Sequence, residues 1–264
     1  DTAGFTIEET DAATEVDESG TTDTFTVVLD AQPTNDVVLT ITSDDTGEAT
    51  VPASVTFTSA DWDTPQTVTV TGVDDSIIDG AITSTITIAV DDANSDDDFD
   101  AVADQTVSVD TTDDDTAGFT IEETDGSTEV DESGTTDTFT IVLDAQPTND
   151  VVLTITSEST TEASVNPSSV TFTSENWDTP QTVTVTGVDE NVVDGDQATN
   201  ITIAILDTAS DDNFDDLADQ TVSVDTLDDD TAGFTIEETD AATEVDESGS
   251  TDTFTVVLDA QPTS

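Results

Sequence analysis

The absence of every basic side chain is the feature that most constrains this chain. Its 264 residues include no lysine, arginine or histidine, but 64 aspartates and glutamates, which gives a formal charge of −64. Two carboxylates about 5 Å apart repel each other by roughly 1 kcal/mol in water, and by several times more in a partly dry site. No internal ion pair can relieve this repulsion, so the neutralising cations must come from outside the chain.

The same composition excludes most kinds of enzyme site. Without histidine and cysteine there is no imidazole base, no Ser-His-Asp relay, no thiolate ligand and no disulfide, and without lysine there is no Schiff base. A strongly anionic chain is repelled by nucleic acid and by anionic membrane surfaces. No run approaches the roughly 20 apolar residues of a membrane span. We therefore expect a non-enzymatic, cation-dependent structural or adhesive protein, with no nucleic-acid partner and no membrane insertion in this segment.

The chain is an array of long repeats. The string D-T-A-G-F-T-I-E-E-T begins at Asp1, at Asp115 and again at Asp230. A period of about 115 residues is too long for a solenoid unit and fits one β-sandwich domain. We expect two complete domains, 1–114 and 115–229, and the first part of a third, 230–264. Because two strands cannot close a sandwich, either the polypeptide continues or a neighbouring molecule completes that third part.

Threonine and β-branched residues alternate along each repeat and predict strands. The strands predicted in the first repeat are 4–8, 24–29, 37–42, 54–58, 66–73, 84–90 and 105–109. Pro33, Pro52 and Pro65 all lie between strands, where a residue without an amide hydrogen is tolerated. The expected fold is all-β, a tandem of seven-stranded antiparallel immunoglobulin-like sandwiches arranged end to end.

The acids gather in the connections between strands. If seven strands alternate in direction, the first, third and fifth connections and the exit of the domain lie at one end. The candidate ligands there in the first repeat are Glu8, Glu48, Asp74, Asp75, Asp79, Asp113, Asp114 and Asp115. The same connections also bring these acids to that end: Glu9, Glu15, Asp17, Glu18, Asp44 and Asp45. Calcium accepts six to eight oxygen ligands in irregular loops, whereas magnesium demands octahedral geometry, so we expect Ca²⁺ as the cofactor.

The acids could form a calcium site, or they could lie in solvated loops that only keep a surface protein soluble. The second repeat allows these two interpretations to be compared. It keeps carboxylates at the corresponding places: Glu122, Glu162, Asp189, Glu190, Asp194, Asp228, Asp229 and Asp230. The third connection loses one acid, because Ser159 stands where the first repeat has Asp45. Acid positions persist while other loop residues vary, which favours a calcium site at this end over simple solvation.

Two further features have a structural and a functional interpretation. The run 91–100 places Asp92, Asn94, Asp96 and Asp98 at the spacing that opens an EF-hand loop, but Asp97 replaces the required glycine and no glutamate stands at the twelfth position. We interpret this run as a loop at the opposite end of the domain rather than a ligand set. Trp62 and Trp177 lie in turns shortly before prolines. For these two side chains, packing at the end of the sandwich is favoured over a role as a carbohydrate-binding platform.

Several of these strings together resemble a known family. V-D-E-S-G-T-T-D-T-F-T-V-V-L, then S-V-T-F-T, W-D-T-P-Q-T-V-T-V-T-G-V-D-D, D-G and a closing D-D-D are similar to the Calx-beta family, in particular to Calx-beta-like repeats of large bacterial surface and secreted proteins. The resemblance implies an immunoglobulin-like sandwich that binds calcium at one pole. It implies ligand roles for Glu8, Asp74, Asp75, Asp79, Asp113, Asp114 and Asp115. The chain departs from the family where the usual glutamate pair is reduced to Asp79 and Gly80.

The expected function is mechanical. We expect an extracellular, cell-surface array of calcium-stiffened sandwiches that serves as an adhesin stalk or as a surface or matrix fibre. Its expected partners are calcium ions, neighbouring repeats or copies of itself, and a cell-surface or matrix ligand. One alternative is a filament subunit that polymerises by strand exchange between partial repeats. Another is a carbohydrate-binding module that uses the two tryptophans.

Overall fold

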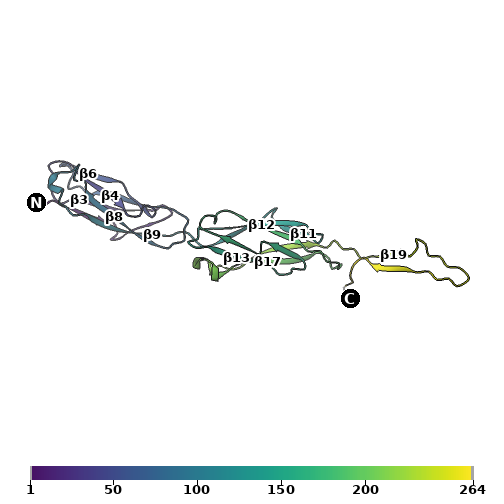
Figure 1. Cartoon of the computed structure of the whole chain (residues 1–264). Helices are drawn as coiled ribbons and strands as arrows, with labels where there is room; N and C mark the ends of the chain where they lie inside the picture. Colours follow the sequence, from purple (N-terminus) through teal and green to yellow (C-terminus); the bar gives the residue numbers. More distant parts are fainter. Residues whose placement is uncertain (1, 263–264) are drawn as a thin grey trace. The chain divides into compact units, whose positions relative to one another are not determined.

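The structure is a computed structural model that describes residues 2–262 (Figure 1). It divides into two compact units, 1–116 and 117–264. The first unit is the first repeat, and the second unit holds the second repeat and a hairpin from the third. The helices among the described residues are three short 3-10 segments: η1 (Asp97–Phe99), η2 (Asp207–Ala209) and η3 (Asp212–Phe214). None of the helices in this described part is long or apolar enough to cross a membrane.

Each complete repeat is a sandwich of two sheets. In the first repeat, one sheet has the strand order β1-β3-β7-β5 and the other has the order β2-β9-β8-β4-β6. The strands are β1 (Phe5–Glu9), β2 (Thr14–Asp17), β3 (Thr22–Leu29), β4 (Val37–Ser43), β5 (Ala49–Thr50), β6 (Ser54–Phe57), β7 (Gln66–Gly72), β8 (Ile82–Val90) and β9 (Gln105–Thr112). The chain is therefore all-β, as the alternating threonines predict.

The second repeat copies this arrangement, with the sheets β10-β12-β16-β14 and β11-β18-β17-β13-β15. Its strands are β10 (Phe119–Glu123), β11 (Thr128–Asp131), β12 (Thr136–Leu143), β13 (Val151–Ser157), β14 (Ala163–Asn166), β15 (Ser169–Phe172), β16 (Gln181–Gly187), β17 (Gln197–Ile205) and β18 (Gln220–Leu227). The third repeat contributes a hairpin of β19 (Phe234–Glu238) and β20 (Phe254–Leu258). Residues 263 and 264 of the expected third part lie outside the described residues.

The strand count and direction correct the prediction. All seven predicted strands are present, but each repeat has two more, β2 and β5 in the first repeat and β11 and β14 in the second. β2 runs parallel to β9, with Thr14 opposite Val109, so this sheet is mixed rather than purely antiparallel. The prediction missed β2 because its four residues include two acids, which weakens the alternation by which a strand is recognised.

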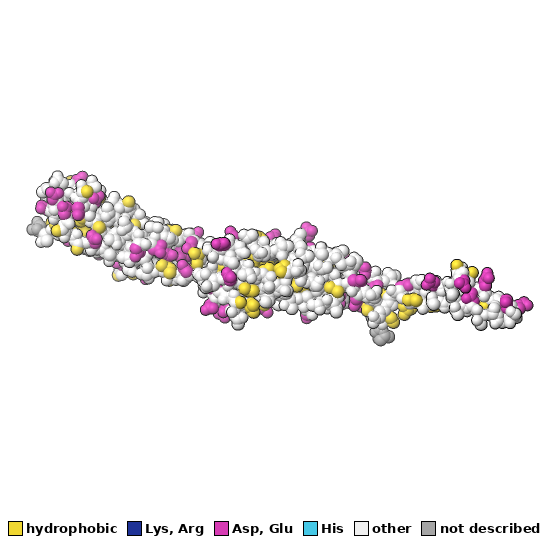
Figure 2. All heavy atoms as spheres, in the orientation of Figure 1, with side chains coloured by type: hydrophobic (Ala, Val, Ile, Leu, Met, Phe, Trp, Pro, Cys, Tyr) yellow, Lys and Arg dark blue, Asp and Glu magenta, His cyan; other side chains and the backbone are white. Residues whose placement is uncertain are grey.

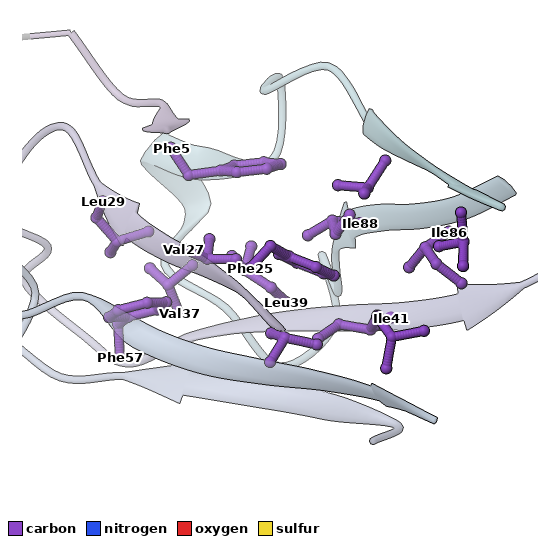
Figure 3. Close-up of a cluster of buried hydrophobic side chains, with 14 of the residues drawn as sticks. Phe5, Phe25, Val27, Leu29, Val37, Leu39, Ile41, Phe57, Ile86 and Ile88 are labelled. Atoms are coloured by element: carbon purple, nitrogen blue, oxygen red, sulfur yellow. The ribbon is translucent and has the colours of Figure 1, made fainter. Parts of the chain in front are cut away.

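The core lies between the two sheets. Phe25 and Val27 of β3 face Leu39 of β4 and Ile86 of β8, and all four side chains are buried (Figure 3). The residues between them along each strand, chiefly threonines, point outward. Burial of apolar side chains stabilises the fold by roughly 25 cal/mol per Å². The apolar content of the chain is therefore concentrated on one face of each strand.

At one end of the sandwich, an aspartate has an entirely structural role. The carboxylate of Asp96 accepts hydrogen bonds from the backbone and hydroxyl of Thr34 and from the amides of Asn35 and Asp98, at 2.7 to 3.1 Å. The bond from the Asn35 amide is the largest cause that lowers the pKa of Asp96 to about 2. Asp211 accepts equivalent bonds in the second repeat. In the 91–100 run, therefore, Asp96 holds a loop in place.

At the opposite end, backbone hydrogen bonds bring the acidic connections together. The amide of Glu18, just after β2, donates to Thr112 at the end of β9 at 3.1 Å. The amide of Val73, just after β7, donates to the carbonyl of Glu48 at 2.9 Å. We call this end of the sandwich the acidic pole. It holds the ends of β2, β4, β7 and β9 and the start of β8.

Candidate metal centre

Side chains in a strand alternate between the core and the solvent, and this alternation continues just beyond the ends of β2 and β9. Several acids therefore lie at core-facing positions. Along β9 the inward positions are Val107, Val109 and Thr111, all buried, and two and four residues further on come Asp113 and Asp115. Along β2 the inward positions are Thr14 and Val16, and the next is Glu18, which is 1% exposed. An extended backbone keeps period-two alternation, so Asp113 and Asp115 are expected to point toward the end of the core. The turn after β2 leaves Glu18 buried there.

Three groups of carboxylates result. Glu18, Asp113 and Asp115 each offer one oxygen, and these oxygens lie within 4.8 Å of one another. The second repeat forms two such groups around one residue. Glu132, which is 0% exposed, meets Asp228 and Asp230 in one group and Glu190 and Asp194 in the other. Glu132 is therefore the residue that the two groups have in common.

A glycine allows the turn that carries the buried glutamate to approach the other sheet. A Cβ added at Gly72, the last residue of β7, would lie 2.1 Å from the carbonyl oxygen of Asp17. Gly187 has the same relation to Asp131 in the second repeat. No side chain fits at that distance. The glycine of the T-V-T-V-T-G-V string is therefore required for the position of Glu18 and Glu132.

Hydrogen bonds fix the exit segment that supplies the aspartates. The carboxylate of Asp113 accepts from the amide of Gly80 at 2.8 Å and from the amide of Asp115 at 2.8 Å. Gly80 has a φ of +76°, a conformation that side-chain-bearing residues rarely adopt. Asp228 accepts the same pair of bonds from Gly195 and Asp230. The connection after β7 and the exit after β9 are thus tied together, and so are their equivalents in the second repeat.

Several buried carboxylate oxygens at the acidic poles lack a hydrogen-bond partner among the described residues. They belong to Glu18, Glu48, Asp115, Glu132, Glu162, Glu190 and Asp230, and in Glu132 both oxygens are unpartnered. Burying a polar group without a partner costs about 1–3 kcal/mol, and a charged group costs more. A ligand that supplies positive charge at those oxygens would relieve these losses in both repeats.

The pKa values at the acidic poles also reflect the burial of these carboxylates and the repulsion between them. Burial, followed by repulsion from Asp113 and other acids, raises the pKa of Glu18 to about 8. Burial, followed by repulsion from Asp228, raises the pKa of Glu132 to about 7. Burial is also the largest cause that raises the pKa of each of these acids: Glu48, Asp79, Asp115, Glu190 and Asp230. Without a cation, burial and mutual repulsion make each of these carboxyl groups harder to ionise.

The donor set suits a hard divalent cation. Every candidate ligand is a carboxylate oxygen, and the groups come from a turn, a loop and an exit segment rather than from one rigid element. Calcium prefers such oxygen ligands and tolerates irregular geometry. Glu18, Asp113 and Asp115 would hold an ion in the first repeat. In the second, Glu132 would hold an ion with Asp228 and Asp230, and it could also hold one with Glu190 and Asp194.

The structure places the other sequence-predicted ligands around these groups. Glu48 is buried beside Glu18, and repulsion from Asp75 and Asp79 contributes to the raised pKa of both glutamates. Glu162 occupies the position of Glu48 in the second repeat. Besides Glu8 and Glu122, six predicted ligands are exposed and belong to none of the three groups: Asp74, Asp75, Asp79, Asp114, Asp189 and Asp229. They add negative charge at the poles, and a role as direct ligands stays a prediction.

Glu8 and Glu122 lie apart from these groups. Both are exposed residues in the middle of strands, where Glu8 pairs with Thr26 and Glu122 with Thr140. The prediction placed the first-strand glutamate at the site and did not include Glu18 or Glu132 among the ligands. Alternation held the signal: with Phe5 inside, Glu8 points outward, whereas with Val16 inside, Glu18 points inward. Recognising T-E-V-D as a strand would have identified the buried glutamate.

These pKa values predict opposite pH responses without and with calcium. In the absence of cations, thermal stability is expected to fall as the pH rises from about 5 to 8. The reason is that the folded chain keeps protons on Glu18 and Glu132 up to about pH 8 and 7, whereas the unfolded chain releases them near 4.5. With saturating calcium the trend is expected to reverse, because binding requires the ionised carboxylates. Melting curves of calcium-free and calcium-loaded protein at several pH values would measure this.

Acids on the surface provide the internal comparison for that experiment. Free aspartate and glutamate carboxyls have reference pKa values near 4 and do not titrate between pH 5.5 and 8. A stability that is flat across this interval in calcium-free buffer would contradict the assignment of Glu18 and Glu132.

Comparisons with known proteins return similarity in structure only. No family model matches the chain, and no curated protein matches it. Among solved structures, the chain is similar to CBD12 from CALX1.2 (12% identity, TM-score 0.33, 83% of this chain and 99% of that one). It is also similar to domains 4 and 5 of the S-layer protein SbsC (15% identity, TM-score 0.34, 86% and 100%) and to a longer piece of the same protein, rSbsC(31-844) (14%, TM-score 0.36, 98% and 36%). The resemblance to the Calx-beta family stays a prediction, and the fold is a tandem of β-sandwiches.

Proposed function

We propose that the chain is a non-enzymatic, extracellular array of β-sandwiches stiffened by calcium, and that it serves as a stalk or fibre of a cell surface or matrix. The observation that supports this most strongly is Glu132, which is fully buried with both oxygens unpartnered and belongs to two carboxylate groups at once. A chain without lysine or arginine has no cation of its own to place there.

The position of the ligands explains how an ion would stiffen the array. Asp113 and Asp115 lie in the segment that connects the end of β9 to Phe119, the first residue of β10. Asp228 and Asp230 lie in the equivalent segment, which connects β18 to Phe234 of β19. The segment that would bind the ion is therefore also the linker to the following repeat. Calcium would supply the charge that lets these linker carboxylates lie together, and each linker would then have one ordered conformation instead of many.

The surface agrees with this role. The face drawn in Figure 2 shows carboxylates and no basic side chain, as the composition requires. Such a surface repels copies of itself and other anionic polymers, which keeps a long array soluble. Calcium is millimolar outside cells, so sites with dissociation constants of about 10⁻⁴–10⁻³ M would be occupied there.

Small-angle X-ray scattering of the intact chain tests this function. Calcium is expected to narrow the distribution of particle dimensions, because ordered linkers restrict the repeats to few relative positions. Asp113→Asn combined with Asp115→Asn should abolish this response at the first linker. Glu8→Gln is the matched control, since Glu8 is an exposed carboxylate outside the ligand groups. Identical scattering with calcium and with chelator would count against a stiffening role.

A second candidate function, assembly by strand exchange, rests on the hairpin of the third repeat. β19 and β20 pair in the same register as β1 and β3, but Phe234 and Phe254 are 63% and 55% exposed. Their equivalents, Phe5 and Phe25, are buried in a complete sandwich. Strands from another copy could cover this face. Sedimentation velocity across a hundredfold dilution distinguishes assembling chains, whose sedimentation coefficient falls, from monomers, whose value is constant.

A further inference from the structure

The connection that carries two of the candidate ligands also contacts the next repeat. Between β16 and β17 the chain runs from Glu190 through Val192 and Val193 to Asp194. Val192 forms a parallel β-bridge with Gln261, which follows β20 in the hairpin of the third repeat. The amide of Gln261 donates to the carbonyl of Asn191 at 2.5 Å. An apolar tip, flanked on both sides by carboxylates, therefore meets the start of the following repeat.

The hairpin provides a groove for this tip. A cavity of about 420 Å³ has Val193 on one side and the hairpin on the other. The hairpin residues that line it are Ala232, Gly233, Leu258, Ala260, Gln261 and Pro262. Most of these are apolar or small. Val193 is a large apolar side chain that is 38% exposed, and it lines this cavity.

The first repeat has the same groove at the same place. Ala3, Ala31, Gln32 and Pro33 line a cavity of about 740 Å³ together with Phe99 and other residues of the 96–102 segment. The string L-D-A-Q-P supplies this edge in each repeat, at 29–33, 143–147 and 258–262. The apolar tip also recurs, as Ile77-Ile78 in the first repeat and Val192-Val193 in the second. The first repeat thus has a groove at the end that precedes its acidic pole, and both complete repeats have an apolar tip at the acidic pole.

We propose that the Val192-Val193 tip and the 258–262 groove form a joint that couples cation binding in one repeat to the seating of the next. The occupant of the groove is the two-residue apolar tip of the preceding repeat. The coupling rests on the proposed function, because Glu190 and Asp194 on either side of the tip belong to one carboxylate group with Glu132. An ion there would fix both ends of the connection and hold the tip against the groove. Without the ion, repulsion between those carboxylates would move the two ends of this connection apart.

A pair of introduced cysteines tests the joint in the intact chain. The protein has no cysteine of its own, so Val192→Cys with Gln261→Cys provides a single thiol pair at the β-bridge. The rate of disulfide formation under a mild oxidant reports how often the tip is seated. Calcium is expected to raise this rate. Thr179→Cys with Gln261→Cys should not close, because Thr179 precedes β16, at the end of that strand away from the acidic pole.

A matched pair of substitutions separates the apolar contact from the metal. Val193→Ser, added to the 192–261 cysteine pair, is expected to slow disulfide formation about tenfold, since it removes the apolar group from the groove. Leu206→Ser is the control, because Leu206 is 40% exposed, similar to Val193, but follows β17 at the other end of the repeat. Equal rates for the two serine variants would overturn the joint.

Calorimetry with calcium alone as the titrant distinguishes failure of the joint from failure of the proposed function. If calcium binds but leaves the disulfide rate unchanged, the coupling is overturned. If calcium does not bind, the proposed function and the coupling both fail, and the Val193→Ser comparison alone decides whether the apolar contact stands. Val193→Ser is expected to leave the number of bound ions unchanged, because it removes no carboxylate from the ligand groups.

Discussion

Replacing Glu132 by glutamine is expected to invert the response of the second repeat to calcium. In calcium-free buffer near pH 8 the variant should be more stable than the parent by about 1–3 kcal/mol, because it removes an ionised group that is buried without a partner. In saturating calcium it should be less stable than the parent, because the group shared by both candidate ion positions is lost. Thermal melting in the two buffers, with calorimetry for calcium affinity, measures both effects.

Glu122→Gln is the control for this experiment. It removes the same charge from the same repeat, but from an exposed strand position outside the ligand groups. Its effect should be small and equal in the two buffers. Glu18→Gln and Glu8→Gln form the matching pair in the first repeat. If Glu122→Gln lost calcium affinity and Glu132→Gln kept it, the exposed first-strand glutamate would be the ligand and the buried one would not.

Removal of calcium is expected to lower the melting temperature of the chain by about 10 °C. A ligand present at 100 times its dissociation constant stabilises the folded state by about 2.7 kcal/mol for each site. For a domain of this size, 1 kcal/mol corresponds to about 4 °C in melting temperature. Calorimetric melting in calcium and in chelator measures the change. The second repeat, which has two carboxylate groups around Glu132, should shift more than the first.

Salt and magnesium separate site binding from general screening. Sodium chloride at matched ionic strength screens exposed carboxylates but does not coordinate them. It should therefore reverse only part of the decrease in melting temperature that calcium removal causes. Magnesium should recover less than calcium, because the ligands come from irregular segments that do not favour octahedral geometry. If sodium chloride restored the full melting temperature, the effect of calcium would be screening, and no specific site would be needed.

The strands could be predicted because each carries threonine and an apolar residue in strict alternation. Q-T-V-T-V-T-G predicts β7 with one apolar face, and the structure buries Val68 and Val70. β5 was missed because two residues are too few to show a period. The four residues of β2 show one, but Glu15 and Asp17 occupy its outer face, and acids are rare in strands. Its parallel pairing with β9 joins segments about 95 residues apart, which local patterns do not report.

The candidate site could be predicted in part, for the same reason. Asp113 and Asp115 follow a strand whose register is clear from the sequence, so their convergence with other acids at one end could be inferred. The buried glutamate could not be assigned until β2 was known, because its direction depends on the register of that strand. The contact between Val192 and Gln261 depends on how a loop of one repeat meets the next, which no periodicity encodes.

Anomalous diffraction from crystals of the intact chain grown with calcium tests the central claim most directly. The account predicts calcium peaks 2.3–2.6 Å from carboxylate oxygens of Glu132, shared with Asp228 and Asp230 and with Glu190 and Asp194, and a peak beside Glu18 in the first repeat. Calcium found only at exposed surface carboxylates, with Glu18 and Glu132 free of any cation at millimolar calcium, would contradict it.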